Sequence, residues 1–310
     1  MRPAFSILFF TVLVGAAQGL VCTLALAVLL DIGLAPGLLR WALGLAELLL
    51  AAGLAASFMH LGHKGRAWRA VLMWRSSWMS REVILLPLFI ALVALWWLAL
   101  QSGAGAPWSW LLPLLALSGA LALWYCTAMI YACLRFIEEW AHPLTIVNFT
   151  LIGLSSGLVL ACALAALAGQ PHTVQTLGRY ALPVTLAAWA ARGQTLRRNA
   201  GIRHASNLQT ATGIRSGTLV QKSMGMSAGS FNTREFFHGA SPAALQNMRR
   251  GFLLLAFVLP ASLLAWGLAS GALWPWWLAV LVQAPGLLAE RWFFFAQARH
   301  PQNLYYQTVS

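Results

Sequence analysis

The chain has 310 residues, of which 60% are hydrophobic and only 9% are charged, and it contains 16 tryptophans. This composition excludes a water-soluble protein, because too few polar residues are present to cover a soluble surface. The formal charge of +13 does not indicate nucleic-acid binding, since a soluble basic domain with interleaved aromatic residues is missing. The sequence therefore predicts an integral membrane protein that is surrounded largely by lipid and has no nucleic-acid partner.

Apolar runs recur from end to end, and each is long enough to cross a hydrocarbon core of about 30 Å as a helix. The period-two alternation that is typical of a membrane barrel is absent. We therefore expect an all-α fold, a polytopic membrane helix bundle of about eight transmembrane helices that forms a single membrane domain over 1–310. The expected spans are 5–30, 38–59, 83–101, 110–135, 144–168, 175–192, 251–271 and 274–297.

Two of these spans need comment. The sixth, 175–192, is the weakest, because it is short, contains Pro183 and begins beside Arg179. The first follows a cation and has the apolar character of a signal peptide. It is longer than the apolar region of such a peptide, which has about 7–15 residues, and no convincing cleavage site precedes Asp31. We expect it to remain as a helix of the mature protein.

Lysine and arginine lie almost entirely on one side of this eight-helix arrangement. They occur near both termini, in the loop 60–81 and in the long loop 193–250, whereas the opposite side keeps only Arg40 and Arg179. Basic loops of membrane proteins are retained on the cytoplasmic side. We therefore expect both termini and both long loops to be cytoplasmic.

The segment 57–82 joins the second and third spans and is too amphipathic for a simple loop. It holds two histidines, five cations and three tryptophans before its first acid. One interpretation is a short interfacial helix in contact with anionic lipid, with indoles at headgroup depth. A second uses His60 and Glu82, which lie at the ends of adjacent helices, where a quinone headgroup would lie. Quinone reduction takes up two protons with two electrons, so a quinone site needs protonatable groups.

Glu82 also has a structural interpretation, because it follows Ser80 in the first turn of a helix, where a carboxylate meets the helix dipole favourably. Two further acids fall within spans. For Glu290, ion pairing with Arg291 or reach toward the interface is a sufficient explanation. Glu47 has no such neighbour, which leaves either a proton path toward a quinone or a buried hydrogen bond between helices.

The histidines and cysteines argue against metal centres in this chain. All seven histidines lie at span ends or in loops, whereas membrane cytochromes hold haem with histidines inside the bilayer. The four cysteines lack CxxC spacing, and we expect them to be packing residues inside apolar helices. We expect no metal site here.

The loop 193–250 is too long to be a mere connector. It is rich in Gly, Ser, Thr and Asn, it is strongly basic, and it contains the aromatic stretch FNTREFFHG at 231–239. These phenylalanines indicate that its second half docks on the inner face of this protein or on another subunit.

Four blocks of sequence together carry a family resemblance. They are RPAFSILFF near the N-terminus, HLGHKGRAWRAVLMWRSSWMSREV, CTAMIYACLRFIEEWAHPLT at 126–145, and ERWFFFAQARHPQNLYYQ near the C-terminus. Along nearly the whole chain they resemble the DmsC family, the membrane anchors of dimethyl sulfoxide reductase-type molybdoenzymes. Within it, NTREFFHG and HPQNLYYQ look most similar to the anchors of sulfite:quinone oxidoreductases.

The resemblance implies a complex of three parts in the bacterial inner (cytoplasmic) membrane: a molybdopterin catalytic subunit, an iron-sulfur electron-transfer subunit and this anchor. The anchor would exchange electrons with a quinone, ubiquinone or menaquinone. It would hold no haem, no iron-sulfur cluster and no molybdenum, and no catalytic residue of its own. The sulfite branch is thought to face the cytoplasm, which agrees with the charge asymmetry.

The resemblance also implies a quinone-binding site. In this family a histidine in the motif matching MHLG and a glutamate at the start of the next helix are implicated in quinol binding, and here they correspond to His60 and Glu82. His63 is in a position to share the role of His60. Three arginines are candidates for stabilising negative charge on the quinone, although each could equally contact lipid phosphate. They are Arg66, Arg69 and Arg81.

Other functions remain open at this point. A transporter would have midplane polar groups, broken helices and corresponding halves, of which only Glu47 is evident. A purely structural tether would leave the quinone to another subunit. The anchor of a dimethyl sulfoxide, thiosulfate or tetrathionate reductase is a further alternative within the family.

Overall fold

The computed structural model describes residues 4–59, 61–204, 206–222 and 239–305. Within these ranges the chain forms helices and no strand, which confirms the expected all-α fold. Seven helices of the described ranges are long and apolar enough to cross a membrane. They are α1 (Phe5–Leu29), α2 (Pro36–Met59), α3 (Trp78–Gln101), α4 (Trp108–Ala132), α5 (Pro143–Leu167), the continuous helix Pro242–Ser270 and α11 (Trp274–Ala296).

The weakest expected span lies within α6 (Pro171–Ala200), which has 30 residues and runs beside α5 through the bundle. It is not among the seven apolar helices, because many of its side chains are polar. Neighbouring helices bind those side chains: the hydroxyls of Thr185 and Ser155 are 2.8 Å apart, and Asn148 donates to Thr195 at 2.7 Å. Polar side chains on its buried face are therefore bound by protein, and its low hydropathy is consistent with its place in the bundle.

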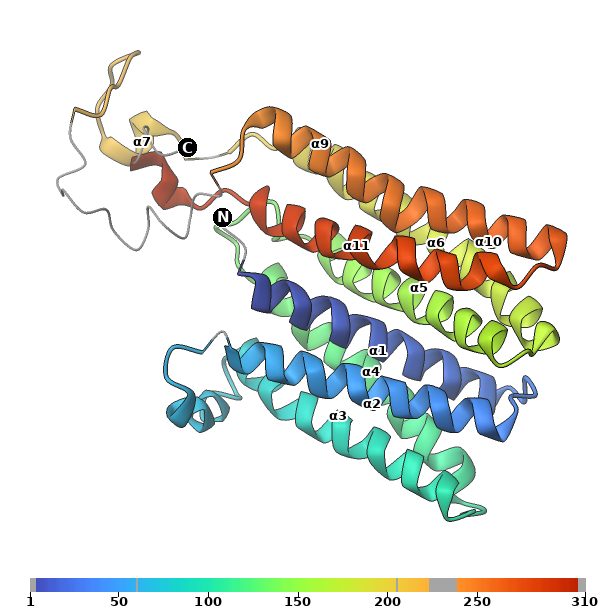
Figure 1. Ribbon diagram of the computed structural model, residues 1–310. Helices are drawn as coiled ribbons and strands as arrows, with labels where there is room; N and C mark the ends of the chain where they lie inside the picture. The colour runs from blue at the N-terminus through green and yellow to red at the C-terminus, as the bar shows by residue number, and fades with distance from the viewer. Residues whose placement is uncertain (1–3, 60, 205, 223–238, 306–310) are drawn as a thin grey trace.

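The bundle has two groups of helices (Figure 1). One contains α1 to α4, and the other contains α5, α6, α11 and the helix made of α9 (Pro242–Leu253), η2 (Leu254–Val258) and α10 (Leu259–Ser270). The groups meet where α1 packs on α5. A Cβ atom on Gly19 would lie 1.9 Å from the carbonyl oxygen of Gly153, and one on Gly157 would lie 1.9 Å from the carbonyl carbon of Gly19. These glycines allow the two backbones to touch.

The continuous helix Pro242–Ser270 contains a π-helical turn, η2, directly before Pro260. Proline has no N–H, so the carbonyl of Ala256 loses its usual helical donor. The side chain of Gln283 on α11 supplies one, with its Nε2 atom 3.2 Å from that oxygen. Gly286 permits the approach, because a Cβ there would lie 2.4 Å from the backbone nitrogen of Ala256.

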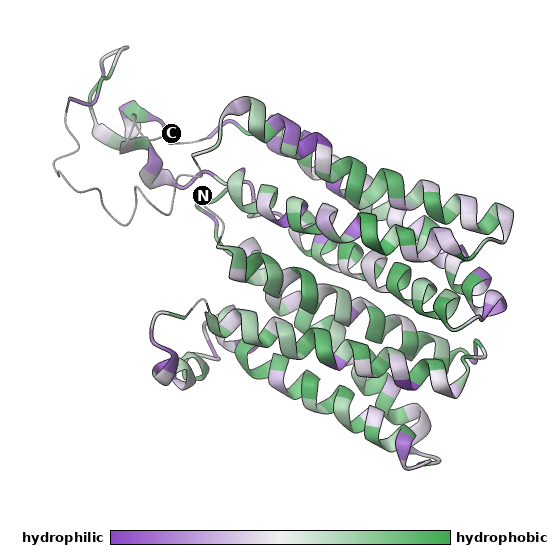
Figure 2. Ribbon diagram, in the orientation of Figure 1, coloured by the Kyte–Doolittle hydropathy of each residue, from purple (hydrophilic) through white to green (hydrophobic). Residues whose placement is uncertain are grey.

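One end of the bundle, which we call the loop end, gathers the irregular segments. The beginning of α1, the end of α11, η1 (Lys64–Val71), α7 (Leu208–Thr212) and η3 (Pro301–Tyr305) all lie there (Figure 1). Figure 2 shows hydrophobic residues along the helices and hydrophilic residues in η1 and in the first part of α9. The first and last described residues and the described parts of both basic loops lie at this end, and the side of the membrane stays a prediction.

The interfacial segment contains a short helix, as expected, which is a 3₁₀ helix over Lys64–Val71, and Trp68 on it is exposed. One local expectation changes. Cys133 does not lie inside an apolar helix, since it is exposed and follows the last residue of α4. The other three cysteines are buried, as expected of packing residues.

Candidate functional site

Glu82 lies near the start of α3, with its side chain in the protein interior. The N-cap of this helix is Ser77, whose side chain accepts a hydrogen bond from the backbone N–H of Ser80. Glu82 is therefore beyond the first turn, and the expected interaction with the helix dipole is wrong. The residue is only 7% exposed, and Oγ1 of Thr127 on α4 donates to its Oε1 atom. The only described hydrogen bond to this carboxyl thus comes from a neutral group.

Arg81 fastens the preceding loop to α3. Its Nε atom donates to the carbonyl of Trp74 at 2.9 Å, and Nη2 donates to the carbonyl of Arg75 at 2.8 Å. The guanidinium also lies 4.1 Å from the ring centroid of Trp78. These contacts hold the loop against the helix that carries Glu82, and a direct contact of Arg81 with quinone stays a prediction.

The remaining residues of the predicted quinone site are dispersed. His63 is the N-cap residue of η1 and is exposed, as is Arg66, while the guanidinium of Arg69 lies 5.7 Å from the ring centroid of Trp68. His60 lies outside the described residues. The structure thus places Glu82 in the interior. The predicted cations Arg66 and Arg69 lie on the exposed loop that precedes α3.

Glu47, the predicted proton-path residue, is half-buried on α2. Its Oε1 atom is buried and has no hydrogen-bond partner among the described residues. A buried carboxyl oxygen without a hydrogen-bond partner lowers the stability of a membrane helix bundle. Its role in proton transfer stays a prediction.

Glu290 belongs to a buried ion cluster rather than to the interface. Its Oε1 atom is 2.7 Å from Nε of Arg192 on α6, and its Oε2 atom is 2.5 Å from Nε of Arg291. The three side chains are at most 6% exposed. The expected pairing with Arg291 is confirmed, whereas reach toward the interface is wrong, because Glu290 is fully buried.

Aromatic rings surround this ion cluster at the loop end. The guanidinium of Arg291 lies 4.3 Å from the ring centroid of Phe149 and 5.1 Å from that of Phe294. Trp140, in the loop after α4, donates from Nε1 to the carbonyl of Phe294 at 3.1 Å. Rings that face a cation stabilise it without adding negative charge, so the cluster remains net positive.

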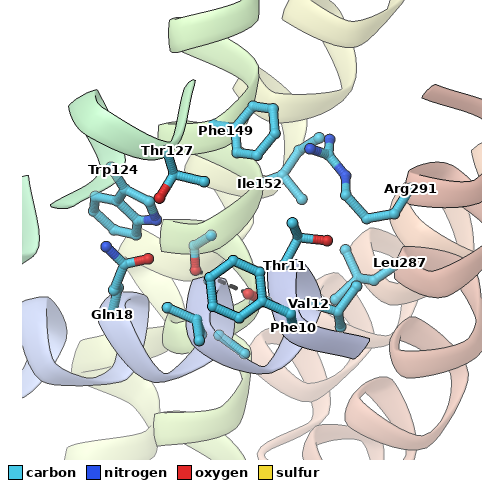
Figure 3. Close-up of a pocket in the computed structure, with 15 residues that line it drawn as sticks. Phe10, Thr11, Val12, Gln18, Trp124, Thr127, Phe149, Ile152, Leu287 and Arg291 are labelled. Carbon is cyan, nitrogen blue, oxygen red and sulfur yellow. Dashed lines mark hydrogen bonds between the residues drawn. The ribbon is translucent and has the colours of Figure 1, made fainter. Parts of the chain in front are cut away.

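A cavity of about 30 Å³ separates the Glu82 site from this ion cluster (Figure 3). Thr127 and Trp124 of α4 lie on one side of it and Arg291 of α11 on the other, with Thr11 of α1 and Phe149 of α5 between them. Thr127 thus touches both the carboxyl of Glu82 and the cavity. Sequence reasoning missed Thr127, because one hydroxyl within an apolar span gives no signal by itself.

Protonatable groups also gather at the aqueous rim of the loop end. His204 lies 3.7 Å from Glu138 and 3.6 Å from Glu139, measured between ring nitrogens and carboxylate oxygens. Burial and the nearby Arg198 lower the pKa of His142. This keeps the ring neutral, so that its Nδ1 atom accepts a hydrogen bond from the N–H of Leu144 and caps α5.

The described part of the chain contains no cluster of three histidine, cysteine or acidic side chains with the spacing of a metal site. The described side chains of the loop end offer hydrogen bonding and proton exchange. The absence of haem and of iron-sulfur clusters stays a prediction.

Comparison with known proteins decides the family. The family model of the DMSO reductase anchor subunit (DmsC) matches residues 1–222. The chain belongs to the DmsC anchor family. It is also similar to a subunit of the sulfite dehydrogenase of Allochromatium vinosum, with 46% identity over 326 aligned positions that cover 100% of both chains. This DmsC family member is thus a multi-pass membrane subunit of an oxidoreductase complex.

Proposed function

We propose that this chain is the quinone-reactive anchor of a membrane-bound molybdoenzyme that oxidises sulfite. It takes electrons from an iron-sulfur subunit, which receives them from a molybdopterin catalytic subunit, and it transfers them to ubiquinone or menaquinone. Support comes from the family, from the similarity to a subunit of a sulfite dehydrogenase, and from a buried acid at the loop end. Membership of the family alone would also fit the anchor of a reductase.

The single observation that carries quinone reactivity is the state of Glu82. The carboxyl is buried, lies near the loop end and receives its described hydrogen bond from a neutral hydroxyl. Such a carboxyl can take up and release a proton without leaving a buried cation unpaired. A quinone accepts two electrons and two protons, and Glu82 is a group that can exchange those protons.

The residues of the loop end fit a quinone headgroup in their chemistry. Glu82 would exchange a proton, while His60 or His63 would donate a hydrogen bond to a carbonyl oxygen. Arg66 and Arg69 would attract negative charge on the ring. The cavity beside Thr127 has a volume of only about 30 Å³ and cannot hold the ring, which we place outside it.

The orientation that we propose puts the loop end in the cytoplasm. The described segments 201–204 and 206–222 of the long loop, which include α7, lie at this end (Figure 1), and they contain Arg203, Arg215 and Lys222. Positive loops favour the cytoplasmic side of the inner membrane. The same cations would steer an iron-sulfur subunit toward the loop end, which is where its electrons must arrive.

The proposal is tested with His60→Ala and Glu82→Gln in the assembled complex. Each should reduce quinone-linked turnover by at least about 100-fold, because a general acid or base typically accelerates a reaction by at least that factor. Turnover with a soluble electron mediator should stay near the wild-type level. A matched control is His172→Ala, because His172 begins α6 at the opposite end of the bundle.

Full quinone-linked turnover in both variants would contradict the proposal and favour a purely structural tether. Loss of both activities together, with the soluble subunits released from the membrane, would also count against it. That result would assign these residues to assembly rather than to quinone chemistry.

A further inference from the structure

We propose that the cavity between α1, α4, α5 and α11 is an internal water site through which Glu82 exchanges its proton (Figure 3). This inference rests on the proposed function, since it assigns the proton route to the acid that serves the quinone. It assigns Thr127 as the proton relay, Trp124 and Arg291 as positioning groups, and Gly15 as a lining position.

The size and the lining of the cavity match water. Its volume of about 30 Å³ is enough for one or two water molecules and too small for an organic ligand. Trp124 lines this space, and its indole Nε1 atom is buried and has no hydrogen-bond partner among the described residues. Trp124 is 2% exposed, so its N–H cannot reach bulk solvent. An acceptor inside the cavity would satisfy it.

The hydroxyl groups of the lining can accept hydrogen bonds from water. Their donors are already used, because Thr11 donates to the carbonyl of Ile7 at 2.9 Å and Ser156 donates to that of Gly153 at 2.9 Å. Hydroxyl oxygens keep lone pairs after donating. A water molecule can therefore accept from Trp124 and donate to a hydroxyl, and internal waters of this kind bind with about three hydrogen bonds.

Thr127 connects the water site with Glu82. Its hydroxyl donates to the carboxyl of Glu82, and the residue also lines the cavity. When water gives a proton to the hydroxyl oxygen, the original hydroxyl proton passes to the carboxylate. One water O–H bond and one threonine O–H bond break, and one threonine O–H bond and one carboxyl O–H bond form. The hydroxide that remains regains a proton from the aqueous phase, and the reverse sequence releases a proton.

Arg291 stabilises the negative charge that forms in the cavity during this proton exchange. Figure 3 shows its side chain on the side of the cavity opposite Trp124 and Thr127. A cation there stabilises the hydroxide that forms when Glu82 takes up a proton, and the low dielectric of the interior strengthens the effect. Glu290 holds Arg291 in place through its Oε2 atom. The ion cluster thus acts on Glu82 through the cavity without touching it.

Gly15 offers a way to fill the cavity. Thr11, Gly15 and Gln18 lie at positions i, i+4 and i+7 of α1 and share the face that lines it. A Cβ atom on Gly15 would meet nothing within 4 Å, whereas one on Gly153 would lie 2.7 Å from Nε1 of Trp124. Small side chains at Gly15 can therefore occupy the space of the water without a clash.

The experiment measures hydrogen-deuterium exchange of the Glu82 carboxyl by infrared difference spectroscopy of the intact complex. The carboxyl band is assigned by its loss in Glu82→Gln. In Gly15→Val, exchange should slow by at least about tenfold, with Gly15→Ala between this variant and the wild type. Thr127→Val should slow exchange similarly, while Thr127→Ser should retain it. Turnover with a soluble mediator should not change in any of them.

The matched control is Gly251→Val in α9, where a Cβ atom also meets nothing within 4 Å and which does not line the cavity. It should exchange at the wild-type rate. An unchanged rate in Gly15→Val, with the carboxyl band in its place, would overturn the water site. Full quinone-linked turnover in both Glu82→Gln and His60→Ala would instead contradict the proposed function, and the exchange rates would still decide whether the cavity serves Glu82.

Discussion

The regions around Glu82 and Glu290 differ in how a buried carboxyl is compensated. Both acids lie toward the loop end and are almost inaccessible, at 7% and 0% exposure. Glu290 lies between the guanidiniums of Arg192 and Arg291, whereas Glu82 receives a hydrogen bond from the hydroxyl of Thr127. Burial alone therefore does not identify a functional acid in a membrane helix. We propose that the compensating partners distinguish the two acids, because Glu290 pairs with two guanidiniums whereas the described partner of Glu82 carries no charge.

The largest effect is expected from Glu290→Gln. Without the carboxylate, Arg192 and Arg291 are two buried cations with no described counter-charge. Breaking a buried pair by removing one partner lowers stability by about 3–5 kcal/mol. Denaturant unfolding of the detergent-solubilised anchor would measure the loss. Glu138→Gln is the control, since Glu138 is 34% exposed at the rim. Equal stability of Glu290→Gln and wild type would show that the cluster does not hold the fold together.

A smaller effect is expected from Thr127→Val, which keeps the shape of the side chain and removes its donor. The carboxyl of Glu82 then loses its described hydrogen bond, and the free energy of unfolding should fall by about 1–3 kcal/mol. The same unfolding assay would measure it. Thr127→Ser should lie close to wild type because it restores the hydroxyl. If both variants lose the same free energy, the contribution comes from packing of the methyl group rather than from the hydrogen bond.

The smallest effect on stability is expected from Glu82→Gln. An amide oxygen accepts the hydrogen bond of Thr127 as a carboxylate does, and no described cation is left unpaired, so the change should be below about 1 kcal/mol. This outcome, together with loss of quinone-linked turnover, would separate Glu82 from Glu290 most clearly. A loss as large as that of Glu290→Gln would remove the distinction between the two acids.

The sequence predicts the apolar helices well, because their length and composition reflect the bilayer directly. The α6 helix shows where this reasoning weakens. Its expected span was 175–192, and the helix runs over Pro171–Ala200. Arg192 at the end of that span, like Thr185 inside it, has its partner on another helix. Hydropathy measures affinity for lipid, so it underestimates a helix whose polar groups are bound by protein.

The candidate site was predictable only in part for the same reason. Glu82 stands out as a lone acid at the start of a span. Its partner Thr127 is 45 residues away along the chain. Likewise, Arg192 and Glu290 form an ion pair although they lie on different helices, and no local sequence pattern connects the two positions. The cavity depends on side chains of four helices, so only the packed structure reveals it.

The backbone contact between Gly19 and Gly157 has a consequence for biosynthesis. The two glycines are separated by 138 residues of chain, which a ribosome takes roughly 7–28 s to make at about 5–20 residues per second. During that interval the glycine face of α1 has no native partner. This face of α1 therefore stays beside lipid or an insertion factor until α5 emerges, and the two helix groups cannot close earlier. Premature contacts of α1 with other small-residue faces are the hazard that this order of synthesis creates.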